Sequence, residues 1–416
     1  MKNVLVIGGG GREHAVCYAL SKSSKIGKLF CVPGNAGIAQ IATCKPLSVF
    51  DFDGVYEYIK EQNIDLVFVT PDDPLAKGMV DYLAERGVRA FGPTATAARI
   101  ESSKAFSKEF MVRHGIPTAK SEIFDCADKA KVYLESADYP IVIKSDGLAL
   151  GKGVIICADK AEAMQGIDDI MVKKAFGEAG NTVLIEEFLV GREVTVMAFC
   201  DGTHISIMPS SQDHKRAYDG DKGLNTGGMG AFAPSPYFTA SHKQEFIERI
   251  ALPTVKGLKQ DGIEFKGVIY FGLMMTDKGI KVIEYNSRLG DPETEAVLPL
   301  LKTDLVDIME ACIDGTLDTL NVEWLDKVGF TVVVASGGYP ASVVKGYEIT
   351  IGELDGVILF HAGTAIKDGK LVTNGGRVFQ LSGVADDMES ARKLVYGQID
   401  KIKFKDSRYR TDIGRI

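Results

Sequence analysis

The first hundred residues alternate between short apolar runs and longer segments with helical spacing. Residues 4–7, 29–32 and 66–70 are apolar enough to be buried strands, and each ends at a turn rich in glycine or proline. Residues 12–20 and 53–62 have the spacing of helices. Strands that alternate with helices form right-handed β-α-β units with a parallel sheet. We therefore predict an open α/β domain over residues 1–102.

The pattern changes after residue 140. Residues 141–144 and 154–157 are two strand-like runs joined by a glycine-rich connection, which predicts a β-hairpin. Residues 183–188 and 193–199 follow as two further strands. We expect these four strands to form one antiparallel sheet with a helix laid on it, an α+β module.

The remainder continues in the same mixed style. An amphipathic helix is predicted near residues 244–261, and strands are predicted at 267–275 and 281–286. Residues 326–416 are rich in strand-forming residues and glycine turns, which predicts a small β-rich C-terminal domain.

Composition narrows the class of protein. The 416 residues carry a net charge of −8, and the sequence pI is about 5.5. This balance argues against a broad surface for nucleic acid or anionic membrane. No apolar run approaches the roughly 20 residues of a membrane span. The 7 cysteines are scattered without C-x-x-C spacing, so we expect free thiols and a cytoplasmic protein.

The N-terminal motif is a glycine run, Gly8 to Gly11, between a strand and a helix. Backbone N–H groups at a helix N-terminus favour phosphate. A dinucleotide site needs G-x-G-x-x-G, but Glu13 stands at the third glycine, and no acidic ribose ligand follows the second strand. The motif therefore favours a small phosphorylated group over NAD. The alternative is that the glycines serve only a tight turn.

Two further segments suggest a nucleotide site. KSDGLALGKGV, residues 144–154, lacks Walker A spacing but is a glycine-rich hairpin that could close over a triphosphate, with Lys144 and Lys152 as phosphate ligands. EEFLVGREV, residues 186–194, could present backbone groups to adenine and Glu193 to the ribose. Each signal is weak alone, and a solvated acidic turn explains the second segment equally well.

Residues 210–232 form a long glycine-rich stretch with almost no core-like periodicity. Long loops inside compact domains are usually functional or disordered. Asp213 lies beside the basic residues of the sequence DHKR, and glycines at 227, 228 and 230 permit close backbone approach. Disorder is the alternative, although Met229 and Phe232 offer apolar anchors.

EYNSRLGDPE, residues 284–293, is the most informative segment. Side chains alternate along a strand, so Glu284 and Asn286 share a face, with Arg288 next on it. Carboxylate and amide oxygens suit Mg²⁺, which shares its remaining positions with phosphate oxygens. Arg288 can neutralise charge on a transferring phosphoryl group. An edge strand with a polar face is the alternative.

Together these segments resemble the ATP-grasp superfamily and, within it, the phosphoribosylamine–glycine ligase (glycinamide ribonucleotide synthetase) family. The resemblance covers essentially the whole chain and rests on six segments in the family's order: GGGGREHA, PGNAG, FGPTATAARIESSKAFSKEFM, KSDGLALGKGV, SSQDHKRAYDGDKGLNTGGMGAF and EYNSRLGDPE. It implies an N-terminal pre-ATP-grasp α/β domain over 1–102, an ATP-grasp domain over 103–325 with a mobile lid at about 120–190, and a C-terminal domain over 326–416.

The resemblance also implies roles for individual residues. The expected ATP ligands are Lys104, Lys144, Gly151, Lys152 and Gly153 for the phosphates, Glu186, Glu187, Phe188 and Leu189 for adenine, and Glu193 for ribose. The expected metal ligands are Glu284 and Asn286. The expected substrate-binding residues are Gly9, Gly10, Gly11, Arg12, Asn35, Asp213, Gly228 and Gly290. The expected catalytic residues are Arg288, Asp213 and Lys215.

The implied reaction joins glycine to 5-phosphoribosylamine through a glycyl phosphate, with ATP and Mg²⁺ or Mn²⁺, and yields glycinamide ribonucleotide, ADP and phosphate. This is the second step of de novo purine biosynthesis. We expect small-molecule substrates and no nucleic acid, membrane or obligate protein partner. The alternatives are another ATP-grasp carboxylate ligase, a non-catalytic nucleotide-binding regulator and, disfavoured by the N-terminal motif, an NAD-dependent oxidoreductase.

The chain departs from the family pattern at a few positions. Leu224 stands where proline is expected, Leu289 where phenylalanine is usual, and Ser145 where alanine is common. Thr70 and Asp72 replace the glycine and glutamate of a Gly-Pro-Glu turn. These departures concern substrate affinity rather than the chemistry.

Overall fold

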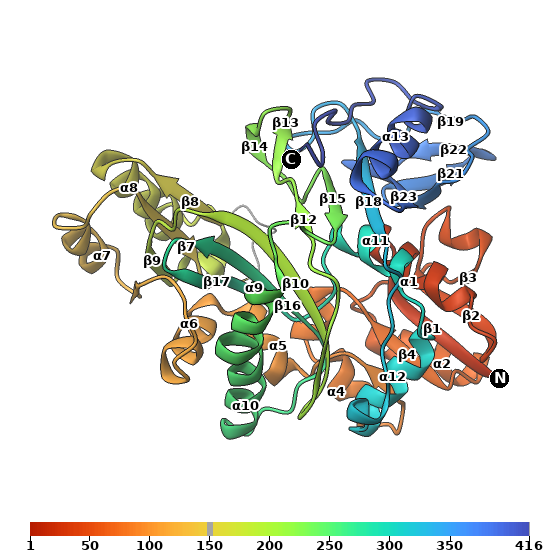
Figure 1. Ribbon diagram of the computed structural model, residues 1–416, viewed down its shortest axis with the longest axis horizontal. Coiled ribbons are helices and arrows are strands. Elements are labelled where there is room, and N and C mark those ends of the chain that lie inside the picture. The colour runs from red at the N-terminus through yellow and green to blue at the C-terminus, as the bar shows by residue number, and fades with distance from the viewer. Residues whose placement is uncertain (148–152, 416) are drawn as a thin grey trace.

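The computed structural model describes residues 1–147 and 153–415 of the chain. Figure 1 shows three bodies around a central sheet, with the N-terminus at one end of the long axis and helices α7 and α8 at the other. In the part of the chain that is described, no helix has the length and apolar character needed to cross a membrane.

The N-terminal body is a parallel sheet in the order β3-β2-β1-β4-β5, as predicted. Its strands are β1 (Lys2–Gly8), β2 (Ile26–Pro33), β3 (Thr43–Cys44), β4 (Leu66–Val69) and β5 (Ala90–Phe91). Its helices are α1 (Gly11–Ser21), α2 (Phe52–Gln62), α3 (Asp72–Ala76), α4 (Met79–Ala84) and α5 (Ala95–Ser102). Near-continuous apolar strands fit a sheet that helices cover on both faces.

The second body is an antiparallel sheet in the order β6-β9-β7-β8. Helix α6 (Lys104–Arg113) leads into it. Its strands are β6 (Ser121–Phe124), β7 (Ile141–Ser145), β8 (Val154–Cys157) and β9 (Val183–Glu187), and its helices are α7 (Ala127–Leu134) and α8 (Lys160–Ile167). We call this body the lid sheet. The predicted pairing of residues 141–144 with 154–157 is present, with Ile141 opposite Cys157.

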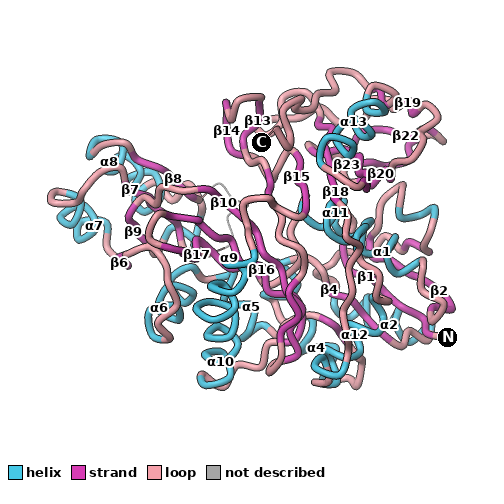
Figure 2. Tube along the Cα trace, viewed as in Figure 1, coloured by secondary structure: helices cyan, strands magenta, loops and turns pink. Residues whose placement is uncertain are grey.

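The central sheet is antiparallel, in the order β11-β10-β16-β17. Its strands are β10 (Arg192–Asp201), β11 (Ile205–Ile207), β16 (Lys266–Thr276) and β17 (Gly279–Asn286). Figure 2 shows α9 (Ala240–Phe246) and α10 (Leu252–Gln260) beside its long strands. Alternate residues of β10 enter two cores: Val196 and Ala198 face the α9–α10 side, while Phe199 faces the side of α11 (Glu293–Val297) and α12 (Leu305–Asp314).

One prediction about this region is wrong. The strands at 183–188 and 193–199 do not share a sheet, because β9 belongs to the lid sheet and β10 to the central sheet. The chain crosses from one sheet to the other at residues 188–191. Gly191 makes the crossing possible, since a β-carbon there would overlap the carbonyl oxygen of Met275 on β16.

The C-terminal body is built on a sheet in the order β12-β15-β18-β23-β20. Its strands are β12 (Gln212–Asp213), β15 (Gly230–Ala233), β18 (Val328–Ala335), β20 (Ile358–His361) and β23 (Arg377–Ala385), and α13 (Met388–Ile399) packs on it. Small pairs add β19 (Thr350–Ile351) with β24 (Ile402–Lys403), and β21 (Thr364–Lys367) with β22 (Lys370–Thr373).

Residues 210–232 are therefore not a structureless loop. Two of their strands, β12 and β15, extend the C-terminal sheet, and a hairpin of β13 (Arg216–Tyr218) and β14 (Lys222–Asn225) lies between them. Met229 and Phe232 are buried in the C-terminal core and anchor the stretch, so the disorder alternative is wrong.

Candidate active site

A β-bulge sets the direction of the predicted metal ligands. Gly272 on β16 pairs with Glu284, but the next residue, Leu273, pairs with Val282, so Ile283 is an extra residue in β17. A bulge re-aims the side chains that follow it. Val282 before the bulge and Tyr285 after it both enter the same core. Glu284 and Asn286 consequently point away from that core, onto the opposite face of the sheet.

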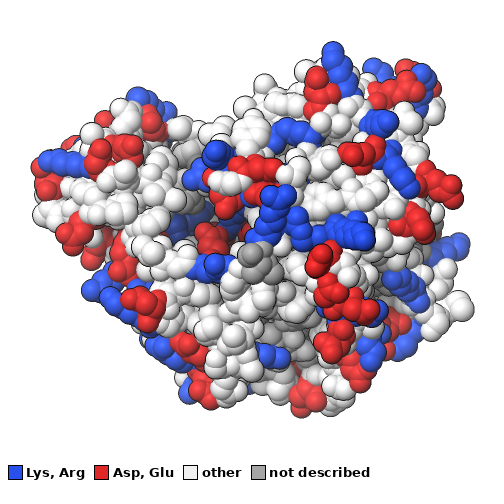
Figure 3. All heavy atoms as spheres, turned by 45° about the horizontal axis from the view of Figure 1, so that its top comes forward, with Lys and Arg blue, Asp and Glu red and all other residues white. Residues whose placement is uncertain are grey.

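Four cationic side chains surround Glu284. Burial alone would raise the pKa of Glu284, but Lys215, Lys144, Lys104 and Arg288 hold that pKa below its usual value. These cations come from β7, from α6 and from segments next to β12 and β17 that are far apart in sequence. Figure 3 shows basic and acidic side chains gathered in the hollow between the lid sheet and the rest of the molecule. The Glu284 carboxylate therefore remains ionised, because these cations offset the effect of its burial.

Arg288 is fixed beside these ligands. Its Nη2 lies 2.9 Å from Oε1 of Glu101 and donates to Oδ1 of Asn286 at 3.3 Å. Burial would lower the pKa of Arg288, but Glu101 beside it holds that pKa above the usual value. Glu101 in turn accepts two hydrogen bonds from Ser287, both at 2.8 Å. Nε of Arg288 is buried and has no hydrogen-bond partner in the described part of the chain.

Glu101 was not among the predicted site residues. It lies in the last turn of α5, in the IESSK segment, where it resembles any helical acid. Only its burial beside Arg288 distinguishes it.

The lysines predicted for ATP lie at the junction of α6 and the lid sheet. Lys104 Nζ donates to the carbonyl oxygen of Gly147 at 2.7 Å. Lys144 Nζ lies 2.7 Å from Oε2 of Glu186, and Lys108 Nζ lies 2.9 Å from Oε1 of the same carboxylate. Burial would raise the pKa of Glu186, but the two lysines hold it below the usual value. Lys108 was missed by sequence reasoning.

The other predicted nucleotide ligands follow along the crossing between sheets. Glu187 pairs with Lys281 on β17 at 2.6 Å, and Glu193 pairs with Lys215 at 2.7 Å. Phe188 is exposed and Leu189 half-buried. Gly153 is buried, and its carbonyl oxygen accepts the N–H of Ser145 at 2.8 Å. Gly151 and Lys152 lie outside the described residues.

Asp213 and Lys215 flank the same region. Burial raises the pKa of Asp213 to about 7, against the lowering effect of Lys215, and Glu293, Glu193 and Glu284 add to the rise. Burial would lower the pKa of Lys215, but Asp213 and Glu193 hold it well above the usual value. Asp213 is thus a carboxyl group whose charge depends on the cations placed near it.

The N-terminal glycine loop reaches the same site. Arg12 Nη1 and Arg288 Nη1 both donate to the carbonyl oxygen of Leu289, at 3.2 and 3.1 Å. Glu13, which stands where a dinucleotide site needs glycine, accepts the Gly10 N–H at 2.6 Å and pairs with Arg12 at 2.6 Å. The loop is therefore closed on the Glu13 carboxylate.

The predicted glycines and Asn35 shape the loops around this site. A β-carbon at Gly9 would lie 2.6 Å from the carbonyl oxygen of Gly34, and one at Gly11 would overlap the Gln380 side chain. Asn35 Nδ2 donates to the carbonyl oxygens of Gly9 at 3.0 Å and His361 at 2.7 Å. Asn35 thus braces the glycine loop against the C-terminal body with its own amide.

Gly228 and Gly290 bring two more turns together. Gly228 has a φ of +113°, and a β-carbon there would overlap the Pro292 ring. A β-carbon at Gly290 would lie 2.5 Å from Oε2 of Glu293. Arg377 Nη1 bridges the two turns by donating to the carbonyl oxygens of Gly227 at 2.7 Å and Asp291 at 2.9 Å.

Comparison with known proteins agrees with this architecture. Family models of phosphoribosylglycinamide synthetase match three parts of the chain: the N domain at residues 2–101, the ATP-grasp (A) domain at 102–294 and the C domain at 329–416. The chain belongs to the phosphoribosylglycinamide synthetase family.

Relatives of the phosphoribosylglycinamide synthetase family include both separate and fused proteins. The phosphoribosylamine–glycine ligase of Caldanaerobacter subterraneus subsp. tengcongensis is 46% identical over 412 residues, covering 99% of each chain. The trifunctional purine biosynthetic protein adenosine-3 of Gallus gallus is 47% identical, over 99% of this chain and 42% of that protein.

Solved structures confirm the predicted fold class. A crystal structure of phosphoribosylamine–glycine ligase from Thermotoga maritima matches with a TM-score of 0.88 and 36% identity, covering 99% of each chain. The biotin carboxylase domain of Hydrogenobacter thermophilus 2-oxoglutarate carboxylase matches with a TM-score of 0.75 at 16% identity, over 98% of this chain and 91% of that one. The second likeness concerns the fold alone.

The structure shows where the residues lie that depart from the expected family pattern. Leu289 is buried in the core beneath α11 and α12, and Leu224 is exposed on β14. Thr70 is buried, and its hydroxyl donates to Oε1 of Glu13 at 2.7 Å, which helps to hold the N-terminal loop. Ser145 is also buried, on β7. Asp72 begins α3 and lies near Arg288, whose pKa it helps to raise.

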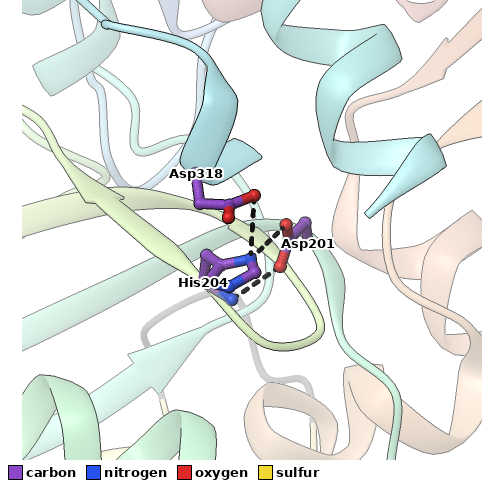
Figure 4. A group of neighbouring side chains, drawn as sticks. All are labelled: Asp201, His204 and Asp318. Atoms are coloured by element: carbon purple, nitrogen blue, oxygen red, sulfur yellow. Dashed lines mark hydrogen bonds and ion pairs between the residues drawn. The ribbon is translucent and has the colours of Figure 1, made fainter. Parts of the chain in front are cut away.

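A second cluster of metal-type ligands lies away from this site. Asp201, His204 and Asp318 come together where β10 turns into β11 (Figure 4). Asp201 already accepts N–H groups from Thr203 at 2.9 Å, His204 at 2.6 Å and Leu317 at 3.0 Å, and pairs with His204 Nδ1 at 2.9 Å. This carboxylate is therefore satisfied within the protein and braces the turn.

Proposed function

We propose that this chain is an ATP-dependent ligase that joins glycine to 5-phosphoribosylamine and forms glycinamide ribonucleotide, ADP and phosphate. The observation that carries the proposal is the re-aimed face of β17, where Glu284 and Asn286 lie among four cationic side chains. Family membership supports the same reaction, since relatives that match over the whole chain are named phosphoribosylamine–glycine ligase.

The donor set fits magnesium-bound ATP. Glu284 and Asn286 offer the carboxylate and amide oxygens that Mg²⁺ or Mn²⁺ takes, and the remaining positions would be filled by phosphate oxygens and water. The four cations around Glu284 are groups that the negative charge of a polyphosphate would attract. The buried Nε of Arg288, which has no partner among the residues that the structure describes, offers a further donor for an anion. When bound, magnesium-ATP supplies the phosphoryl group that activates the glycine carboxylate as glycyl phosphate.

The chain's own residues position the substrates and stabilise the charge of the transferred phosphoryl group. We assign Lys104, Lys144 and Arg288 to spreading the negative charge of the phosphoryl group, which is the main catalytic contribution expected for this chemistry. Residues 186–189 and Glu193 are assigned to adenine and ribose, and Gly151, Lys152 and Gly153 to the closing hairpin. The lid sheet would exclude water and protect the activated carboxylate from hydrolysis.

We assign the acceptor side to the loops that meet at Leu289. The Gly9–Gly11 loop, Arg12 and the turns at Gly228 and Gly290 would bind phosphoribosylamine and glycine. Arg12, although paired with Glu13, lies at this loop, and the N-terminus of the 11-residue helix α1 would add a favourable dipole for a phosphate. Asp213 and Lys215 are assigned to orienting the attacking amine and balancing charge during the transfer.

The proposed substrates are small molecules, and we place the reaction in the cytoplasm. All seven cysteines, each within the described residues, are free thiols, which suits a reducing compartment.

ADP formation tests the reaction directly. The assay supplies ATP, Mg²⁺, glycine and freshly generated phosphoribosylamine and omits each in turn. ADP release should require all four. Release that is indifferent to glycine would assign the chain to a different acceptor or carboxylate.

The metal assignment has its own test. Glu284→Ala should lower turnover by at least about a thousandfold, comparable to the loss of a key electrostatic group. The matched control is Asp277→Ala, an exposed acid in the turn between β16 and β17 of the same hairpin. Near-normal activity of Glu284→Ala at ordinary magnesium would refute the assignment.

A further inference from the structure

Two lysines share one buried carboxylate at the edge of the candidate nucleotide site. Lys108, Lys144 and Glu186 are only 3%, 6% and 5% exposed. Lys108 reaches Oε1 of Glu186 at 2.9 Å, and Lys144 reaches Oε2 at 2.7 Å. The three side chains therefore carry one surplus positive charge in a buried setting.

The two lysines are held differently. Lys108 uses all three of its N–H groups within the protein, on Glu186, on Thr118 Oγ1 at 2.7 Å and on the carbonyl oxygen of Ala119 at 3.1 Å. Lys144 has Glu186 and one weaker contact, the carbonyl oxygen of Ile283 at 3.2 Å. Lys108 is thus saturated, whereas the third N–H group of Lys144 has no acceptor among residues 1–147 and 153–415.

The partners of Lys108 also fix its place in the fold. The Thr118 hydroxyl donates to the carbonyl oxygen of Val282 on β17 at 2.8 Å. The backbone N–H of Val282 donates to the carbonyl oxygen of Pro117 at 2.8 Å. Lys108 therefore connects α6 to the segment that leads into the lid sheet, at the point where that segment meets the central sheet.

We propose that Lys108 is a positioning residue that serves as the fixed counter-charge of Glu186 and so frees Lys144 to turn toward the phosphates of ATP. Within the described part of the chain, Lys108 and Lys144 are the two cations paired with Glu186. A buried carboxylate that loses its partner is strongly unfavourable, so without Lys108 the carboxylate would hold Lys144. With Lys108 in place, Lys144 can leave Glu186 without leaving a buried charge unpaired. The proposal rests on the proposed function, because it takes ATP as the ligand of Lys144.

A double-mutant cycle tests the proposal. Lys108→Gln should weaken ATP binding about tenfold, the worth of one charge-assisted hydrogen bond, because Lys144 then stays on Glu186. In a Glu186→Gln background, the same substitution should weaken ATP binding by less than about twofold, since no carboxylate remains to hold Lys144. Lys108→Arg, which keeps the charge, should recover most of the lost affinity. Glu109→Gln, an exposed neighbour on α6, is the matched control.

The readout is competition of ATP and of adenosine against a fluorescent ATP analogue, with circular dichroism to verify that each variant is folded. Lys108→Gln should weaken ATP and leave adenosine within about twofold, because only the phosphate contact depends on Lys144. An equal loss for ATP and adenosine, or a tenfold loss that persists in the Glu186→Gln background, would overturn the proposal. Binding is measured without glycine or phosphoribosylamine, so a failure of the proposed acceptor chemistry leaves this result unaffected.

Discussion

Acidification should weaken the contact between the N-terminal and C-terminal bodies through His14. His14 on α1 and His361 on β20 are 7% and 4% exposed, and their rings lie 5.6 Å apart. Nδ1 of His14 accepts the backbone N–H of His361 at 2.7 Å. Burial, with His361 adding to it, lowers the pKa of His14 to about 3, and burial lowers that of His361 to about 4.

The sign and size of this pH effect on stability follow from the linkage between proton binding and folding. Below the pKa of an unfolded histidine, about 6.5, the unfolded chain binds protons that the folded chain excludes, so stability falls as the pH falls. At about pH 5 the unfolded histidine is almost fully protonated while the folded one remains neutral. The corresponding loss is about 2 kcal/mol for each of the two histidines, relative to about pH 7.5.

His14→Gln isolates one of these contributions. Glutamine keeps an acceptor for the His361 N–H but does not titrate. Urea unfolding followed by circular dichroism at about pH 7.5 and about pH 5 should therefore show a pH-dependent loss in the variant that is smaller by about 2 kcal/mol than in the parent.

His204 provides a control of opposite sign. Asp201 raises the pKa of His204, so its contribution to stability is present at low pH and is lost as the pH rises through that pKa. His204→Gln should make the acid loss larger rather than smaller. Identical pH dependence in His14→Gln and the parent would refute the buried, neutral state of His14.

Two further predictions concern the stretch at residues 210–232. Gly228→Ala should lower turnover at least about tenfold and the melting temperature by a few degrees, because Gly228 has a positive φ and packs against the Pro292 ring. Unchanged turnover and an unchanged melting temperature in calorimetry would contradict this contact. Arg410 is 2% exposed and ion-paired with Asp412 at 2.7 Å while donating to the Arg216 carbonyl oxygen at 3.0 Å. Arg410→Gln should cost about 3 kcal/mol and speed amide hydrogen exchange in β13 and β14, and unaltered exchange there would show that the C-terminal segment does not hold the hairpin.

Local sequence was sufficient to predict features that depend on residues close together in the chain. The apolar runs at residues 4–7 and 66–70 predicted a parallel sheet, and the glycine run beside Glu13 excluded a dinucleotide pattern. Both depend on short spacing, which the chain retains in any fold. The family resemblance, carried by six ordered segments, is confirmed by the family models over residues 2–294 and 329–416.

The same patterns did not predict which strands pair with one another. Residues 183–188 and 193–199 are similar apolar runs separated by a few residues, yet they enter different sheets. Periodicity states that a segment is a strand, whereas its neighbours are chosen by packing over the whole chain. For the same reason β12 and β15, which lie in an apparently irregular stretch, could not be assigned to the C-terminal sheet.

The sequence by itself predicted Glu284 and Asn286 on β17 as metal ligands, and only the tertiary structure decided where these two side chains point. Strict alternation would place Glu284 on the same face as the buried Val282. The bulge at Ile283 reverses that face, because Leu273 on β16 pairs with Val282 while the preceding Gly272 pairs with Glu284. The surrounding cations, and Glu101 and Lys108 behind them, come from segments up to about 180 residues away, whose approach depends on long-range packing rather than on local spacing.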